Sequence, residues 1–217
     1  MYIPAHFDES RPEVLQALIT AHPLATLVTL TADGLNANHI PLRLHAEGGP
    51  QGILRGHVAR ANALWKEFDP QVEALAIFQG PDSYITPGWY ATKQETGKVV
   101  PTWNYAVVHV YGSLRVIDDP AWLRPHLAAL TETHEAAREE PWHVSDAPAD
   151  YTEKLMLGIV GVELVITRMA GKWKVSQNQP AANQAGVIEG LREHASEGAA
   201  RMANLVAERR KTEDSAL

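Results

Sequence analysis

Short apolar runs bounded by turn residues dominate the first half of the chain and predict β-strands. Residues 24–31 are rich in Leu, Val and Thr, and Ala32-Asp33-Gly34 turns the chain into a second hairpin arm over 35–44. Pro41 lacks a backbone N–H, which places this arm at an edge or a bulge of the sheet. Further strands are predicted over 52–58, 72–79 and 102–117, and a last hairpin joins 160–169 to 172–177 around Ala170-Gly171.

Helices are predicted where capping residues precede apolar residues at helical spacing. Ser10-Arg11-Pro12-Glu13 is a capping box with proline in the first turn, and it begins a helix over 11–22. Asn62 is a suitable cap for a short helix over 62–68, and Asp118-Asp119-Pro120 caps one that runs to about residue 139. The tail over 184–211 also has a helical pattern.

Strands and helices do not alternate regularly, which disfavours a doubly wound α/β fold. Six or more short antiparallel strands interrupted by helices are typical of a β-barrel with helical additions. We therefore expect a mainly β fold with α additions. Residues 1–180 would form the barrel domain, with inserted helices over about 120–157, and 181–217 would form a C-terminal helical extension.

Composition excludes several classes of protein. The 217 residues are 45% hydrophobic and 21% charged, which suffices for a packed core, and they include no cysteine. Disulfides, thiolate zinc sites, iron–sulfur clusters and cysteine nucleophiles are therefore excluded, and a cytoplasmic protein is expected. The first residues lack the pattern of a signal peptide, and no run reaches the roughly 20 apolar residues that span a membrane. A net charge of −7 disfavours non-specific binding to nucleic acid.

The common nucleotide, phosphate and hydrolase motifs are missing. No GxGxxG, GxxxxGK[ST] or GxSxG occurs. His134-Glu135-Ala136-Ala137-Arg138 begins like a zinc helix but has Arg at the second ligand position, so no metal site is predicted, and His126 and His134 are expected to be solvated helix residues. By contrast, 53–66 and 168–180 each contain three cationic residues and no acidic one, which suits an anion.

The segment from Gly56 to Lys66 is the first candidate site. A strand ends near Val58 and a helix begins near Asn62, so free amides at the helix N-terminus would lie beside Arg60 and His57. That arrangement suits a phosphate group. The alternative is an ordinary strand-to-helix connection with a solvated arginine.

The strand over 102–117 and the segment 171–180 supply the second and third candidates. Alternation places Trp103, Tyr105, Val107 and His109 on one strand face and Asn104 on the other, and an aromatic wall beside an amide suits a planar heterocycle. Trp103 in the core is the alternative. In the third segment Trp173 and Val175 point inward, Lys172, Lys174 and Ser176 point to the opposite face, and Gln177 ends the strand. Exposed lysines on a strand also protect an edge from pairing.

Two weaker clusters complete the set. In Asn36-Ala37-Asn38-His39 the two asparagines share a strand face and His39 points to the other face. In the aromatic segment over 83–90, Pro and Gly interrupt the chain, which suggests a loop that covers a site.

Several blocks in this order resemble the PaiB-type family of FMN-binding negative transcriptional regulators, from the N-terminus to about Leu191. They are Gly56-His57-Val58-Ala59-Arg60-Ala61-Asn62, Gly80-Pro81-Asp82-Ser83-Tyr84-Ile85, Trp89-Tyr90, Val100-Pro101-Thr102-Trp103-Asn104-Tyr105, Lys154-Leu155-Met156 with Gly158-Ile159-Val160-Gly161, and Lys172-Trp173-Lys174-Val175-Ser176-Gln177-Asn178. Thr86-Pro87-Gly88 departs from the Ser-Pro-Ser form of the family.

The resemblance implies a split β-barrel like that of pyridoxamine-phosphate oxidases, in a two-fold homodimer with FMN between protomers. It implies Arg60 at the phosphate. It also implies a flavin environment made of His39, His57, Asn62, Trp103, Asn104, Lys174, Ser176 and Gln177.

Three functions stay open at this point. The resemblance implies a negative transcriptional regulator, although the sequence has no clear helix-turn-helix and support for operator DNA as a partner is weak. A flavin-dependent oxidoreductase, or a haem-degrading or pyridoxamine-oxidase-like enzyme, is the alternative; His39, His57 and His109 would then relay protons, and no catalytic residue is assigned. A barrel that binds another anion, or nothing, is the third.

Overall fold

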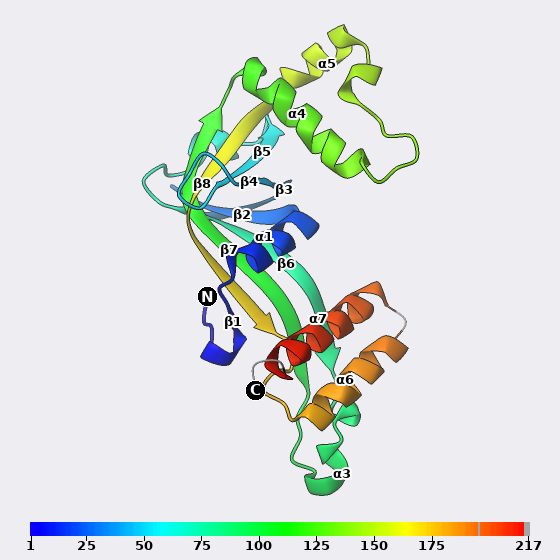
Figure 1. Ribbon diagram of the computed structural model, residues 1–217. Coiled ribbons are helices and arrows are strands. Elements are labelled where there is room, and N and C mark those ends of the chain that lie inside the picture. The colour runs from blue at the N-terminus through cyan, green and yellow to red at the C-terminus, as the bar shows by residue number, and fades with distance from the viewer. Residues whose placement is uncertain (195, 215–217) are drawn as a thin grey trace. The chain divides into compact units, whose positions relative to one another are not determined.

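The computed structural model describes residues 1–194 and 196–214, and its elements are labelled in Figure 1. The strands are β1 (Asp8–Glu9), β2 (Leu24–Thr31), β3 (Gly34–Pro41), β4 (Arg43–His45), β5 (Ile53–Ala59), β6 (Ala74–Ile85), β7 (Thr102–Ile117) and β8 (Ile159–Lys174). The α-helices are α1 (Pro12–Ala21), α2 (Leu64–Glu67), α3 (Thr92–Thr96), α4 (Pro120–Glu135), α5 (Ala149–Met156), α6 (Ala181–Glu193) and α7 (Glu197–Asp214). Within this described part, no helix has both the length and the apolar character needed to cross a membrane.

Contacts divide the chain into two compact units. Unit 1 comprises Met1–Leu18, Gln79–Val108 and Ala170–Leu217, and unit 2 comprises Ile19–Phe78 and His109–Met169. The strand order is β3-β2-β6-β7-β8-β5-β4, with β1 beside β8, and β6, β7 and β8 contribute residues to both units. This division differs from a cut at residue 180, and the expected split into 1–180 and 181–217 stays a prediction.

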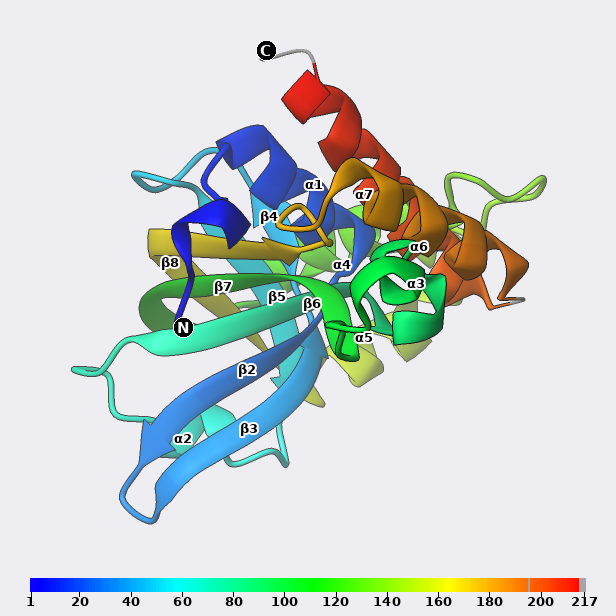
Figure 2. The ribbon, with the colours of Figure 1, turned by 90° about the horizontal axis from the view of Figure 1, so that it is seen from below.

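The predicted first hairpin is confirmed for β2 and β3, as Figure 2 shows, but its second arm ends at Pro41 instead of Leu44. Residues Arg43–His45 form β4, which pairs with β5. Leu24 pairs with Pro41 and Thr31 with Gly34 in an antiparallel register. Gly34 has a φ of 115°, a left-handed conformation that glycine adopts without strain at such a turn. β3 ends the strand order, so Pro41 lies in an edge strand, where its missing N–H removes no ladder bond.

β7 has the bounds and the alternation that its sequence predicts. Asn104, Ala106 and Val108 are buried, and Trp103 on the opposite face is 51% exposed. The interpretation of Trp103 as a core residue is therefore wrong.

β8 is one continuous strand, so the predicted hairpin around Ala170-Gly171 is wrong. Gly171 pairs with Glu9 of β1, and a Cβ at this position would lie 2.3 Å from Leu15 Cδ2 and 2.6 Å from the Glu9 carbonyl oxygen. Glycine is present here because another segment approaches closely, and its presence does not mark a turn.

Three predicted segments differ from the structure. The tail is two helices, α6 and α7, instead of one (Figure 1). The helix expected over 62–68 is a single turn, Leu64–Glu67. The segment 83–90 is not one loop, because β6 continues to Ile85 and a 3₁₀ turn over Pro87–Trp89 follows.

Helix α4 packs on the part of the sheet that belongs to unit 2. Asp119 caps the helix by accepting a hydrogen bond from the N–H of Ala121 at 2.8 Å, as its sequence predicts. Trp122 lies against Gly161 of β8, where a Cβ would come within 2.4 Å of the indole ring. The glycine therefore makes room for this tryptophan, and the helix brings its next turn over β5.

Candidate functional site

The candidate residues divide between the two units. His39, His57, Arg60 and Asn62 lie in unit 2, and Trp103, Asn104, Lys174, Ser176 and Gln177 lie in unit 1.

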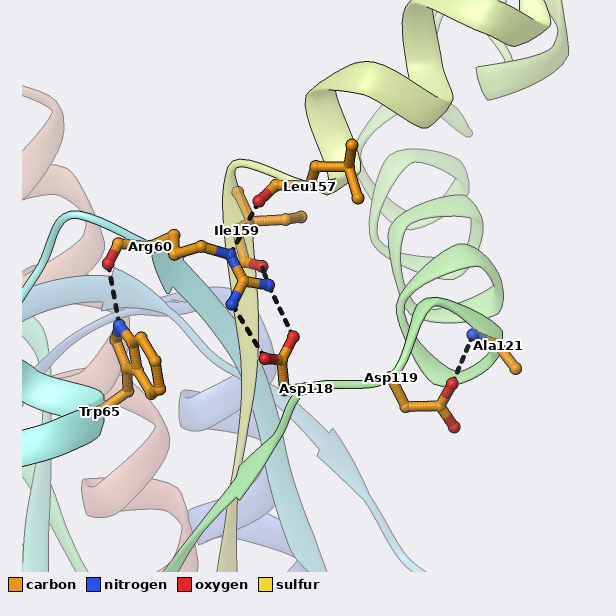
Figure 3. A network of polar contacts seen from close by, with 7 residues as sticks. All are labelled: Arg60, Trp65, Asp118, Asp119, Ala121, Leu157 and Ile159. Carbon is orange, nitrogen blue, oxygen red and sulfur yellow. Dashed lines mark hydrogen bonds and ion pairs between the residues drawn. The ribbon is translucent and has the colours of Figure 1, made fainter.

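Arg60 joins the end of β5 to both ends of the helical insert between β7 and β8, as Figure 3 shows. Its guanidinium forms two hydrogen bonds with the carboxylate of Asp118, of 2.6 and 2.9 Å. It also donates to the carbonyl oxygens of Leu157, at 2.8 Å, and Ile159, at 3.2 Å. Asp118 precedes α4 and Leu157 follows α5, so one side chain holds the entry and the exit of the insert.

These contacts leave little of Arg60 for a phosphate group. Four of its five N–H bonds are directed at oxygens of this chain. The carboxylate of Asp118 raises the pKa of Arg60, and the guanidinium lowers the pKa of Asp118, through their mutual hydrogen bonds.

The helix that begins beside Arg60, α2, has only one turn, and the backbone N–H groups at this point already have acceptors. The N–H of Leu64 is taken by the side-chain oxygen of Asn62 at 2.8 Å, and the N–H of Arg60 by the carbonyl of Gly158 at 2.8 Å. The structural contacts thus support the strand-to-helix connection at this point more than they support a phosphate cradle.

Three asparagine amides form a chain along β3. Asn62 donates to Asn38 at 2.8 Å, and Asn38 donates to Asn36 at 2.6 Å. His39 is exposed and points to the other face of β3, opposite Thr26 of β2. The amides align Asn62 with β3, and the imidazole of His39 stays accessible.

His57 forms a histidine pair with α4. Its Nδ1 lies 3.2 Å from Nε2 of His126, whose ring stacks on Trp122 with a centroid distance of 4.8 Å. His126 is only 6% exposed, so the expectation of a solvated helix residue is wrong. Burial lowers the pKa of His57. Burial also lowers the pKa of His126 to about 4, with smaller contributions from the charges of His57, His45, Arg55 and Arg43.

An ion pair borders this cluster. Arg55 and the indole N–H of Trp122 both donate to Oε1 of Glu163, at 2.8 and 3.2 Å. Glu163 is 8% exposed, and both donors compensate its charge. Sequence reasoning missed Trp122, His126 and Glu163 as a group, because only the spacing of Trp122 and His126 by one helical turn signals that they share a face.

In unit 1, Asn104 and Ser176 form a buried polar pair. The Asn104 amide donates to the Ser176 hydroxyl at 2.8 Å, and its Oδ1 is buried with no hydrogen-bond partner among the described residues. Ser176 has a φ of 64°, in the left-handed region that non-glycine residues seldom adopt. Its side chain is buried, so the expectation that it continues the lysine face of the strand is wrong, because β8 ends at Lys174.

Unit 1 also contains an exposed aromatic pair, Trp103 and Tyr84, and a lysine, Lys174, that contacts the start of β7. Trp103 packs edge-on against Tyr84 with a centroid distance of 6.1 Å, and its indole N–H donates to Asp82 at 3.0 Å. The ammonium of Lys174 donates to the hydroxyl of Thr102 and to the carbonyl of Trp103. Burial, and the nearby charge of Lys172, lower the pKa of Lys174.

The amide of Gln177 is used within its own segment. It accepts from the N–H of Val175 at 2.8 Å and donates to the carbonyl of Trp173. This side chain stabilises the turn that follows β8, and its place in the flavin environment stays a prediction.

Comparison with solved structures identifies the class of fold. The chain resembles the flavocytochrome Anf3 of Azotobacter vinelandii with a TM-score of 0.56 and 16% identity, over 79% of this chain and 72% of that one. The predicted mainly β, split-barrel fold is confirmed.

Sequence comparison then identifies the family. The family model described as "Putative FMN-binding domain" matches residues 1–168, and the chain belongs to this family. It is 35% identical to an uncharacterized protein of Emericella nidulans over 99% of both chains. It is 30% identical to the "Protease synthase and sporulation protein PAI 2" of Bacillus subtilis, over 97% of this chain and 99% of that one. The expected family and its cofactor FMN are confirmed, and the chain is a flavin-binding split-barrel protein.

Acid is expected to loosen the attachment of α4. The pKa of His126 falls from 6.5 in the unfolded chain to about 4 in the folded one, so the unfolded state binds more protons between these values. Above pH 6.5, His126 should therefore leave the free energy of unfolding unchanged. As the pH falls from 6.5 to 4, that free energy should decrease by about 2 kcal/mol, after allowance for partial solvation. Urea titrations across this range measure it.

His126→Gln should reduce this pH dependence, whereas His134→Gln, at an exposed histidine of the same helix, should leave it intact. An unchanged slope in His126→Gln would show that other groups cause the acid sensitivity.

We call the hydrogen bonds of Arg60 to Asp118, Leu157 and Ile159 the Arg60 fork, and its loss should free both ends of the insert. Arg60→Lys keeps the charge but cannot form the paired contacts with Asp118 and the two carbonyls, so proteolysis between α4 and α5 should become faster. Asp118→Asn should have a similar, smaller effect, and Arg138→Lys serves as an exposed control within the insert. If Arg60 instead binds the FMN phosphate, Arg60→Lys will weaken FMN binding while Asp118→Asn will not.

Proposed function

We propose that unit 1 holds the flavin ring, with Asn104 as its polar anchor. The observation that supports this most is the buried Oδ1 of Asn104, an acceptor with no partner among the described residues. A buried polar atom without a hydrogen bond costs about 1–3 kcal/mol, so such an atom in a native protein calls for a ligand or a water molecule.

The chemistry of this atom fits FMN. The isoalloxazine ring carries one imide N–H, and a side-chain amide oxygen accepts from such a donor. The amide nitrogen of Asn104 is already directed to Ser176, which fixes the oxygen as the free end. Ser176 is a positioning residue in this proposal, and its left-handed backbone is the strain that a binding site retains.

Other side chains of unit 1 lie near this strand. Trp103 and Tyr84 expose about half of their surface on the face of β7 opposite to Asn104, so in this proposal the ring held by Asn104 does not stack on them. The ammonium of Lys174 uses two donors on Thr102 and Trp103 and keeps a third for an anionic group. FMN bound there would supply reversible one- or two-electron chemistry.

We propose regulation of transcription as the role of the flavoprotein. The support is membership of the family together with the printed name of the Bacillus subtilis relative, a protease synthase and sporulation protein. The proposal keeps the cytoplasmic homodimer and the negative regulation expected from the sequence. With a net charge of −7, contact with an operator requires a local basic surface or a protein partner.

A flavin-dependent oxidoreductase is the second candidate, and one observation favours it. His109 of β7 is half-buried, its Nδ1 has no partner among the described residues, and burial lowers its pKa. A neutral imidazole with a free nitrogen is suited to proton transfer. Bleaching of the bound flavin by NADH or NADPH would identify this function.

Removal of the Asn104 oxygen should weaken FMN binding. Asn104→Leu leaves the imide N–H without an acceptor, so the Kd for FMN should rise about 10- to 100-fold, which corresponds to roughly 1.4–2.8 kcal/mol. Quenching of flavin fluorescence measures the Kd. Ser176→Ala removes the same internal hydrogen bond but keeps the oxygen, and it should raise the Kd by less than Asn104→Leu does. Equal effects of both variants would contradict the assignment.

A regulator that contacts an operator should retard a specific DNA fragment. Gel-shift titrations should use the DNA upstream of the gene that encodes the protein. The affinity for this DNA should differ at least about fivefold between flavin-loaded and flavin-free protein, because a ligand shifts a regulator only by binding its two states with different affinity. Arg209→Gln with Arg210→Gln tests the basic run of α7. No preferred fragment in either state removes direct DNA binding from the proposal.

A further inference from the structure

The helical insert of unit 2 encloses a hollow that the proposed flavin site does not use. Its volume is about 480 Å³, and it lies among α4, the segment after α4, α5 and the first residues of β8. A hollow of this size is within the range that binds small organic molecules.

Most of the lining is apolar. It includes Leu127, Trp142, Val144, Leu155, Met156 and Ile159. Trp142 is 46% exposed and Leu155 is 55% exposed, so part of this apolar surface faces solvent. An exposed apolar surface in a concave site favours a ligand with an apolar body.

The polar side chains that line the hollow are few, and the charged one is a cation. Arg124 and Thr131 lie on the face of α4 that also carries Leu127, at spacings of three and four residues. Arg124 is the single charged residue among the described residues that line the hollow. The Thr131 hydroxyl has no hydrogen bond to any residue in the described part of the chain, so both groups face the hollow with donors to offer.

The ion pair of Arg124 is easily exchanged. Its partner is Glu153 of α5, at 3.4 Å through one nitrogen, and both side chains are more than half exposed. Such a pair contributes little to stability, because water solvates both charges well. A ligand carboxylate that binds both guanidinium nitrogens would replace one long contact with two better ones.

We propose that this hollow binds a small organic carboxylate with an aromatic or aliphatic body. The body packs between Leu127, Trp142 and Met156, and the carboxylate pairs with Arg124 in place of Glu153. An organic cation would meet the guanidinium and no lining carboxylate. A neutral molecule of the same shape would leave Arg124 with only its long contact to Glu153.

Acidic side chains around the hollow make attraction of an anion depend on close contact with Arg124. Residues 118–153 contain nine acidic side chains against Arg124 and Arg138, and none of the nine lines the hollow. Those carboxylates repel an anion from a distance, and salt screens that repulsion. Affinity for the carboxylate should therefore fall little, or not at all, between about 50 and 200 mM salt.

Calorimetric titration of the full-length, FMN-loaded protein tests the proposal with two probes of one shape. We expect 2-naphthoate to bind one site per chain with a micromolar Kd, about tenfold tighter than neutral 2-naphthalenemethanol. Arg124→Gln should bring the two probes within about twofold of each other. Lys154→Gln, which removes an exposed cation of α5 outside the lining, should leave the tenfold preference unchanged.

Occupancy of the hollow itself is tested by filling it. Leu155→Trp changes an exposed lining residue, so the fold should persist, and it should weaken both probes at least about tenfold. Circular dichroism and retained FMN check that each variant is folded.

Four results would overturn the inference. They are the absence of saturable binding at millimolar probe, equal affinity for the two probes in the unaltered protein, binding that Leu155→Trp does not weaken, and release of FMN by the probe. A change of oligomeric state in Leu155→Trp, without probe binding to the unaltered protein, would instead assign the hollow to a second copy of the chain.

Discussion

The Arg60 fork is the interaction on which the arrangement of unit 2 depends. The helical insert leaves the sheet after β7 and returns at β8, and one guanidinium at the end of β5 binds the residues at both points. Other contacts of α4 with the sheet come from Trp122, which lies against Gly161 and donates to Glu163, and from the histidine pair. A planar side chain with five donors is suited to this task, because it can bind a carboxylate and two carbonyl groups at once.

The surface beneath α4 is polar, unlike the usual underside of a packed helix. His126 and Trp122 meet Arg55, His57 and Glu163, where an amphipathic helix would ordinarily bury aliphatic residues. Such a network is stable only while each member keeps its partner and its charge state. Protonation of the buried histidine is therefore the natural weak point of this attachment.

In the proposed flavin site, the side chains that offer hydrogen bonds to the ligand belong to other segments than Arg60. In unit 1 the buried Asn104 has unmet hydrogen-bonding capacity beside the strained Ser176, and an exposed aromatic pair lies on the other face of β7. Arg60 has the opposite character, since its donors are already directed to oxygens of its own chain. The proposal therefore rests on unmet hydrogen-bonding capacity and not on charge alone.

Local sequence determined the turn of the first hairpin, the bounds of β7, the alternation that exposes Trp103, and the capped start of α4, because period and turn chemistry act over a few residues. The family blocks added the fold and the cofactor. The tertiary structure decided the partners of Arg60, which lie 58 and 97 residues away, and the histidine pair, whose members are 69 residues apart. It also decided that β8 is continuous, because Gly171 meets β1 and α1. Periodicity reports which face a residue occupies, and only folding decides which distant group faces it.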